Sequence, residues 1–156
     1  MRTVKLPRFP VEGGCQCGRL RYRLTAKPLM FYLCHCTECQ RHTSSAFGES
    51  LRCRSADVEL SGPQRTVTRA AESGRIREGV FCPDCGVRVW HGSRGMDIGN
   101  IKAGTLDDTS WLVPAGHIWT RSKQPFVVIA DDELSWQQQP GDGYEAIRKR
   151  WEEMTA

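Results

Sequence analysis

Cysteine placement constrains this chain more than any other feature. The chain has eight cysteines, and seven of them fall in three short groups. The sequence has a charged N-terminal opening with no apolar stretch of the kind that a secretory signal needs, so we expect a cytoplasmic, reducing location. Clustered thiols in such a compartment indicate metal or redox chemistry rather than disulfide bonds. The groups are Cys15 and Cys17; Cys34, Cys36 and Cys39; and Cys82 and Cys85.

Composition narrows the class of protein. A length of 156 residues, 39% apolar residues and a mean hydropathy of -0.48 are typical of one globular domain. No run of about 18 apolar residues is present, so we expect no membrane span. The net charge of +4 is mild and the basic residues are scattered. We therefore do not expect a nucleic-acid partner.

Short runs rich in Val, Ile, Thr, Phe and Trp predict strands, and several of them alternate polar with apolar residues. Glycine and proline separate these runs. The pattern predicts a small, mainly β, antiparallel domain. The expected strands are Leu20–Leu24, Phe47–Arg54, Gln64–Ala70, Val80–Phe81, Val87–His91, Ile98–Ala103, His117–Thr120 and Phe126–Ile129.

Helical spacing is clear only near the C-terminus. Tyr144, Ile147, Trp151 and Met154 recur on one face, which predicts a helix that docks on the sheet or on a partner. Asp142 precedes it as the expected N-cap. A further helical turn is expected within residues 37–45, directly after the second cysteine group.

Cys15, Cys17, Cys82 and Cys85 form two pairs, each followed by a glycine. Two such pairs far apart in sequence are the usual ligands of a closed four-thiolate zinc site, and we interpret them as a structural zinc. Plain buried thiols are one alternative. A redox dithiol at the second pair is another, although that motif needs a following helix and the residues after Cys85 predict a strand.

Cys34, Cys36 and Cys39 supply three soft ligands for a second zinc. If no protein side chain completes the set, the fourth position is open to a substrate. Cys53 and then His42 are the alternatives that would close it and make the metal structural. Three other side chains, Glu38, His91 and His117, are read as solvated, edge or core residues.

The segments "GGCQCGRLRYRL", "CHCTECQRHTSSAFG", "FCPDCGVRVW", "AGTLDD" and "HIWTRSKQPF…DD" resemble, in order and spacing, the glutathione-dependent formaldehyde-activating enzyme family, which is also called centromere-protein-V-like. The resemblance runs from about Gly13 to Trp136. It implies a β-tent fold with two zinc ions, the second of them catalytic and held by Cys34, Cys36 and Cys39. Cys53 lies outside the family signature.

The resemblance also implies condensation of formaldehyde with glutathione to S-hydroxymethylglutathione, formally a carbon–sulfur lyase reaction in reverse. The expected partners are a small thiol such as glutathione and a small aldehyde. Expected partners for carboxylates are Arg41, Lys102, Arg121 and Lys123. The expected divisions are an N-terminal extension at 1–12, the zinc-binding domain at 13–136 and a helical tail at 137–156. A non-catalytic zinc module that binds protein or nucleic acid is the alternative function.

Overall fold

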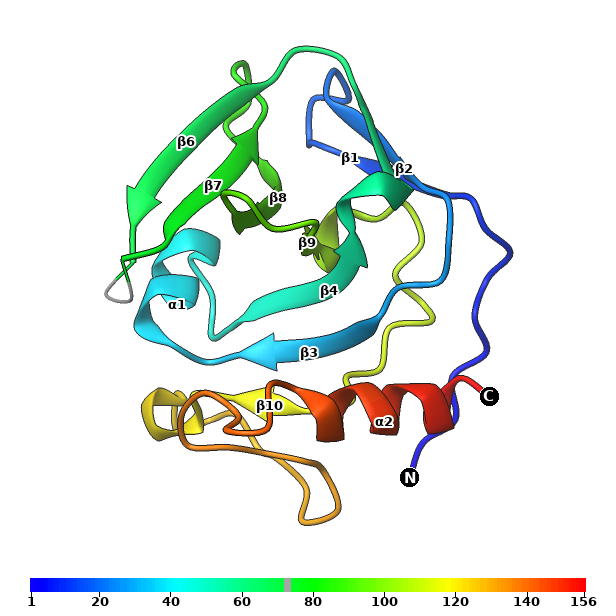
Figure 1. Ribbon diagram of the computed structural model, residues 1–156, viewed down its shortest axis with the longest axis vertical. Coiled ribbons are helices and arrows are strands. Elements are labelled where there is room, and N and C mark those ends of the chain that lie inside the picture. The colour runs from blue at the N-terminus through cyan, green and yellow to red at the C-terminus, as the bar shows by residue number, and fades with distance from the viewer. Residues whose placement is uncertain (72–73) are drawn as a thin grey trace. The chain divides into compact units, whose positions relative to one another are not determined.

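A computed structural model describes residues 1–71 and 74–156 of the chain (Figure 1). In these ranges the fold is mainly β, with ten strands in two sheets and two α-helices. The helices are α1 (Thr37–Thr43) and α2 (Glu145–Met154). The strands are β1 (Val11–Gly14), β2 (Arg21–Leu24), β3 (Met30–Cys34), β4 (Gly48–Arg54), β5 (Val58–Ser61), β6 (Arg65–Ala70), β7 (Ile76–Phe81), β8 (Arg88–Ser93), β9 (Ile98–Lys102) and β10 (His117–Ile118).

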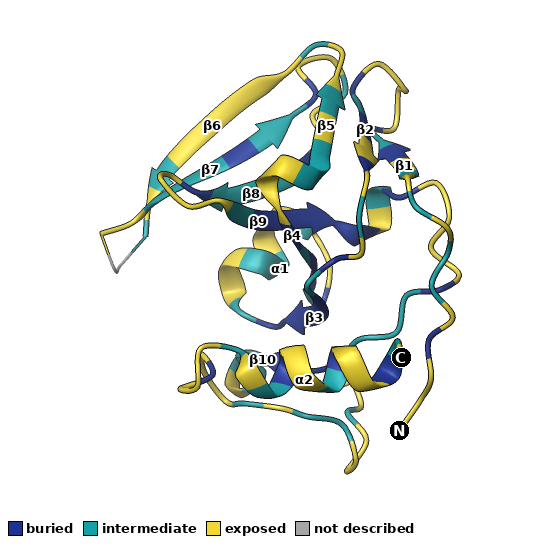
Figure 2. Ribbon diagram, turned by 45° about the vertical axis from the view of Figure 1, so that its right-hand side comes forward, coloured by how far each residue is buried: buried dark blue, intermediate teal, exposed yellow. Residues whose placement is uncertain are grey.

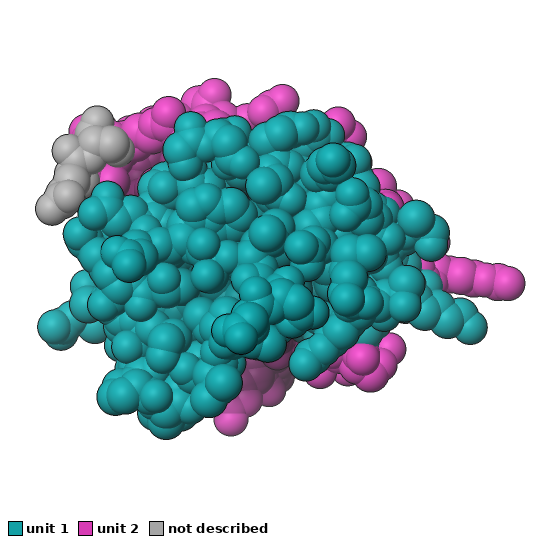
Figure 3. Space-filling view, turned by 90° about the horizontal axis from the view of Figure 1, so that it is seen from below, with its two compact units in different colours: residues 1–6, 29–50, 111–156 teal, residues 7–28, 51–110 magenta. Residues whose placement is uncertain are grey.

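The chain divides into two compact units, coloured separately in Figure 3. Unit 1 comprises residues 1–6, 29–50 and 111–156, and unit 2 comprises residues 7–28 and 51–110. Strand β4 contributes residues to both. None of the helices in the described ranges combines the length and apolar character that crossing a bilayer requires.

Unit 2 contains most of the antiparallel pairing. Strands β1, β2 and β5 lie in that order in one sheet, with β2 paired on both edges. Strand β6 pairs with β7, β7 with β8 and β8 with β9. Its core is built from the inward residues of these short strands. The largest fully buried side chains there include Leu20, Tyr22, Leu24, Leu51, Val89 and Ile101.

Unit 1 is organised around β3, whose five residues are all buried. Strand β10 pairs with it in parallel, setting His117 opposite Leu33 and Ile118 opposite Cys34. Helix α2 packs its apolar side on this unit and turns its charged side outward, as the burial colours of Figure 2 show. The ring of Trp151 meets that of Phe31 edge to face, with 6.5 Å between centroids. The predicted docking of the C-terminal helix is confirmed.

The start of α2 differs in one detail from expectation. Tyr144, not Asp142, occupies the N-cap position, with a φ of 76°. The Asp142 carboxylate nevertheless accepts hydrogen bonds from the backbone N–H of Tyr144 at 3.1 Å and of Ala146 at 3.0 Å. It therefore satisfies N–H groups that the first turn leaves without helical partners.

Trp151 gives a direct test of this packing. Because it is fully buried, Trp151→Ala is expected to lower the free energy of unfolding by about 3–5 kcal/mol. Denaturant unfolding followed by circular dichroism measures the change. Trp151→Phe keeps an aromatic ring against Phe31 and is expected to cost less. Equal losses for the two variants would contradict the packing described here.

Candidate metal centres and their surroundings

The four-cysteine cluster, Cys15, Cys17, Cys82 and Cys85, lies within unit 2. Cys15 and Cys17 follow β1, while Cys82 and Cys85 lie in the turn between β7 and β8. All four sulfurs lie within 4.8 Å of one another. The Sγ of Cys17 is 3.5 Å from that of Cys15 and 3.7 Å from that of Cys82. Tetrahedral zinc with Zn–S bonds of about 2.3 Å needs sulfurs about 3.8 Å apart, so the spacing fits zinc.

The two turns of this cluster are built alike. The N–H of Gly18 donates to the carbonyl oxygen of Cys15 at 3.1 Å, and that of Gly86 to Cys82 at 2.9 Å. Both glycines have positive φ, 81° and 77°, a conformation that residues with a Cβ rarely adopt. The Leu20 N–H points at the Cys15 sulfur at 3.3 Å. Donation of this kind favours thiolate, the form in which cysteine binds metals.

The three-cysteine cluster, Cys34, Cys36 and Cys39, lies within unit 1. Cys34 ends β3, Cys36 is the N-cap of α1, and Cys39 lies in the first turn of that helix. The Cys39 N–H donates to the Cys36 sulfur at 3.3 Å. The three sulfurs lie within 4.8 Å of one another, and no fourth His, Cys, Asp or Glu among the described residues joins them. Cys34 is buried, whereas Cys36 and Cys39 are partly exposed.

The pKa values of the three-cysteine cluster indicate that its thiols cannot all ionise unless a cation is bound. Hydrogen bonds from Cys34 and Cys39 lower the pKa of Cys36 well below its ordinary value. Hydrogen bonds with Cys36 and Cys39, together with burial, raise the pKa of Cys34. Three adjacent sulfurs can all be thiolates only when a positive charge neutralises them. The donor set thus suits a soft divalent metal such as zinc.

The expected alternatives for a fourth ligand lie outside the three-cysteine cluster. Cys53 is 1% exposed, and its thiol donates to the carbonyl oxygen of Leu51 at 3.3 Å. Burial raises the pKa of Cys53 to about 12, so it is a protonated core thiol. His42 lies on the exposed side of α1. Neither belongs to the group of sulfurs that could hold the ion.

A buried histidine pair supports the Cys34–Cys36 segment, and nothing in the sequence indicated it. The Nε2 of His35 and the Nδ1 of His117 are 2.9 Å apart, and the two rings stack. The His35 carbonyl oxygen accepts hydrogen bonds from Gln40 and from Ser122, each at 2.9 Å. The residue between two of the cysteines is therefore held through both its ring and its backbone. His117 is a core residue, as predicted, being 5% exposed.

The four expected carboxylate partners differ in their surroundings. Lys102 is only 7% exposed. The Nζ of Lys123 donates to the carbonyl oxygen of Val127 at 2.6 Å and so braces its own loop. Arg121 lies over the ring of Trp119, 5.0 Å from its centroid. Arg41 is exposed on α1 and lines a pocket.

His91, in unit 2, lies among cationic side chains. Its Nε2 is 3.2 Å from the amide nitrogen of Asn100. Burial, and next the charges of Lys102 and Arg88, hold the pKa of His91 well below 6.5. Below about pH 6.5 the unfolded chain therefore takes up a proton at this residue that the folded chain does not. Stability from this source is present above that pH and is lost as the pH falls.

We expect His91→Gln to flatten the pH dependence of stability. Between pH 6.5 and 5 the wild type is expected to lose up to about 1.4 kcal/mol per pH unit through this residue, and the variant is not. Urea unfolding of both proteins at pH 7.5 and 5.5 measures the difference. Parallel curves for the two proteins would show that His91 is not the source.

The chain is similar to a known protein family and to a solved structure. The model of the family described as "Glutathione-dependent formaldehyde-activating enzyme" matches residues 10–122. No curated protein matches. Among solved structures, a crystal structure of a Rhodobacter sphaeroides protein, a structural genomics target, is similar with 18% identity and a TM-score of 0.47. The similarity covers 62% of this chain and 87% of that one.

Proposed function

Because the chain belongs to the glutathione-dependent formaldehyde-activating enzyme family, we propose that it is a zinc-dependent enzyme of the carbon–sulfur lyase type, which condenses formaldehyde with glutathione to S-hydroxymethylglutathione. The observation that carries the proposal is the three-cysteine cluster, which has three convergent sulfurs and no fourth protein ligand among the described residues. A closed set would leave a metal there with a structural role only.

The two clusters have different proposed roles. Cys15, Cys17, Cys82 and Cys85 would hold a structural zinc, because they supply a complete tetrahedral set. Cys34, Cys36 and Cys39 would hold the catalytic zinc. A zinc ion held by these three residues would supply Lewis acidity, which favours the more nucleophilic thiolate form of a thiol substrate.

The residues of the chain supply orientation and access. The hydrogen bonds to the ring and carbonyl of His35 fix the backbone between Cys34 and Cys36, so the sulfurs need little rearrangement. The partial exposure of Cys36 and Cys39 gives a substrate a route to the cluster. In the reaction a sulfur–carbon bond forms, the carbonyl π bond breaks, and the thiol proton ends on the new hydroxyl. Holding both reactants together lowers the entropic part of the barrier.

The proposal is tested with zinc-loaded protein, formaldehyde and glutathione. NMR exchange spectroscopy at equilibrium measures the rate at which hydrated formaldehyde and S-hydroxymethylglutathione interconvert. We expect a rate that rises in proportion to protein concentration, with two zinc ions per chain. An exchange rate equal to that of the protein-free mixture, in protein that carries both ions, would refute the proposed function.

A further inference from the structure

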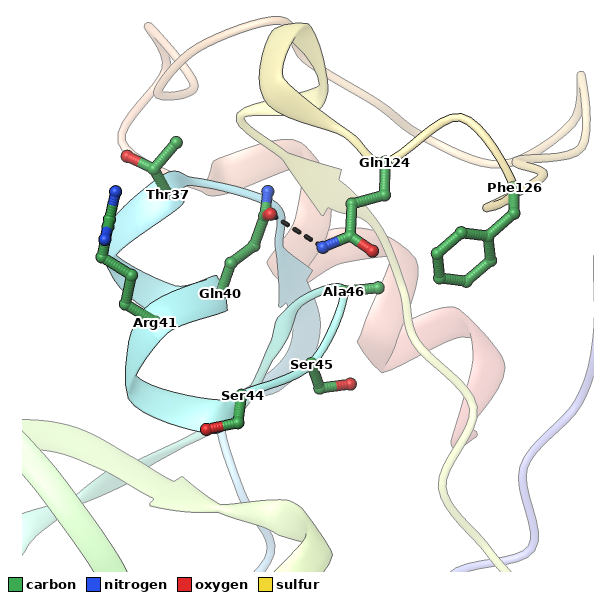
Figure 4. Close-up of a pocket in the computed structure, with 8 residues that line it drawn as sticks. All are labelled: Thr37, Gln40, Arg41, Ser44, Ser45, Ala46, Gln124 and Phe126. Atoms are coloured by element: carbon green, nitrogen blue, oxygen red, sulfur yellow. Dashed lines mark hydrogen bonds between the residues drawn. The ribbon is translucent and has the colours of Figure 1, made fainter.

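A polar pocket lies against α1 in unit 1, and its lining is drawn in Figure 4. Its volume is about 510 Å³, within the range typical of small-molecule sites. One wall is the face of α1 that carries Thr37, Gln40 and Arg41, at helical spacings of three and four residues. The loop that follows α1 and the segment around Gln124 and Phe126 complete it.

The pocket and the three-cysteine cluster are built on the same short helix. Cys36 is the N-cap of α1, Cys39 lies in its first turn, and Gln40 follows Cys36 by about one helical turn. A helix with its side chains is about 10 Å across, so a ligand of a few residues can reach from one side of α1 to the neighbouring side. A ligand in the pocket is thus within reach of the cluster.

Gln40 and Gln124 line the pocket and are held in place by hydrogen bonds. The Gln40 amide nitrogen donates to the carbonyl oxygens of His35 and Ser122, both at 2.9 Å. Its oxygen accepts from the amide nitrogen of Gln124 at 2.9 Å, as the dashed line in Figure 4 shows. The bond to the His35 carbonyl oxygen connects the pocket to the backbone between Cys34 and Cys36. Together these bonds fix the amide groups of Gln40 and Gln124 before any ligand binds.

The charge of the residues that line the pocket favours an anionic ligand. Thr37, Ser44, Ser45 and the two glutamines are neutral hydrogen-bonding groups, and the described residues that line the pocket include no carboxylate. Arg41 is the charged group, and no carboxylate of residues 1–71 or 74–156 forms an ion pair with it. A guanidinium presents a planar set of donors that matches a carboxylate. The rim adds one apolar surface, the ring of Phe126, which is 73% exposed.

We propose that this pocket binds the carboxylate-ended peptide arm of a thiol substrate, and that Arg41 pairs with that carboxylate. The inference rests on the proposed function, since it assigns the remainder of the thiol that reacts at the three-cysteine cluster. In a tripeptide with a central cysteine, each end lies about 7 Å along the chain from that cysteine. Arg41 would therefore determine specificity for a peptide thiol over a small one.

Isothermal titration of zinc-loaded protein with two thiols tests the inference without turnover. Reduced glutathione carries carboxylates, and 2-mercaptoethanol carries none. Arg41→Gln is expected to weaken glutathione binding about tenfold, the loss typical of one charge-assisted pair, and to leave 2-mercaptoethanol binding within twofold. Arg54→Gln removes the same charge from an exposed residue of β4 outside the pocket lining and is expected to change neither.

The other possible outcomes distinguish failure of the Arg41 inference from failure of the proposed function. If Arg41→Gln leaves glutathione binding unchanged, or weakens both thiols equally, Arg41 does not read the carboxylate and the inference fails while the proposed function stands. If the wild type binds neither thiol, the proposed function fails at its thiol step and the inference fails with it. Glutathione diethyl ester, in which both carboxylates are esterified, adds a check, because a ligand without the paired carboxylate should bind the wild type and Arg41→Gln equally.

Discussion

Cys82→Ser is expected to unfold unit 2. Cys82 is 1% exposed and joins the two halves of the four-cysteine cluster. The apparent binding free energy of structural zinc is about 10–16 kcal/mol in small zinc domains, as large as the total stability of about 5–15 kcal/mol that most domains have. Loss of the ion should therefore remove most of the stability of unit 2. The zinc content found by metal analysis is expected to fall from two ions per chain to one, and the melting temperature is expected to be lower by at least about 10 °C.

Cys53→Ser is the matched control for this experiment. It makes the same substitution at an equally buried position in unit 2, where the side chain belongs to neither sulfur cluster and donates to the Leu51 carbonyl oxygen. A serine hydroxyl can keep that bond, so both zinc ions should remain and stability should change by about 1 kcal/mol. Loss of zinc from Cys53→Ser, or its retention in Cys82→Ser, would contradict the assignment of the structural site.

Cys36→Ser is expected to abolish activity while the protein stays folded. Cys36 is the N-cap of α1, and its sulfur already accepts the Cys39 N–H. Serine is a good N-cap residue, so the helix should persist with one sulfur fewer. Loss of about 4 kcal/mol of transition-state stabilisation corresponds to a decrease of roughly 10³ in turnover. The NMR exchange rate gives the activity, and the melting temperature is expected to move by only a few degrees.

His42→Gln separates an open site from a closed one. His42 lies on the same helix but outside the group of three sulfurs. Its substitution is expected to leave zinc content and turnover unchanged. If His42→Gln or Cys53→Ser released the second zinc as readily as Cys36→Ser does, the site would be closed by a protein ligand. The proposed catalytic role would then be excluded.

Runs rich in β-branched and aromatic residues, several of them alternating polar with apolar residues, predicted a number of the strands. Strands β2, β4, β6 and β9 lie within a residue or two of their expected bounds. Strand β3 was missed because all five of its residues are buried, which leaves no alternation to detect. The predicted strand at Phe126–Ile129 is wrong. Phe126 and Val128 are 73% and 87% exposed in a loop, so their β-branched and aromatic character does not reflect packing.

The cysteine spacing predicted both sulfur clusters, because cysteines a few residues apart can bring their sulfurs together locally, and each pair of the four-cysteine cluster is also followed by a glycine. It could not predict the surroundings of the second cluster. The His35–His117 pair joins residues 82 positions apart, and the Gln40–Gln124 pair joins residues 84 apart. Such pairings follow from how β10 and the segment after it return to β3. They carry no periodic signal, and in a single sequence each residue looks like an ordinary polar side chain.

The separation of the cysteines along the chain sets the order in which the two ions can be taken up. The sulfurs of Cys17 and Cys82 are 65 residues apart in sequence, so the four-cysteine cluster exists only after a long loop has closed. The other three sulfurs lie within positions 34–39 and need no loop closure to meet. We therefore expect the three-cysteine cluster to be able to bind metal while the chain is still being synthesised, and the four-cysteine cluster to bind metal only after its two distant pairs have met.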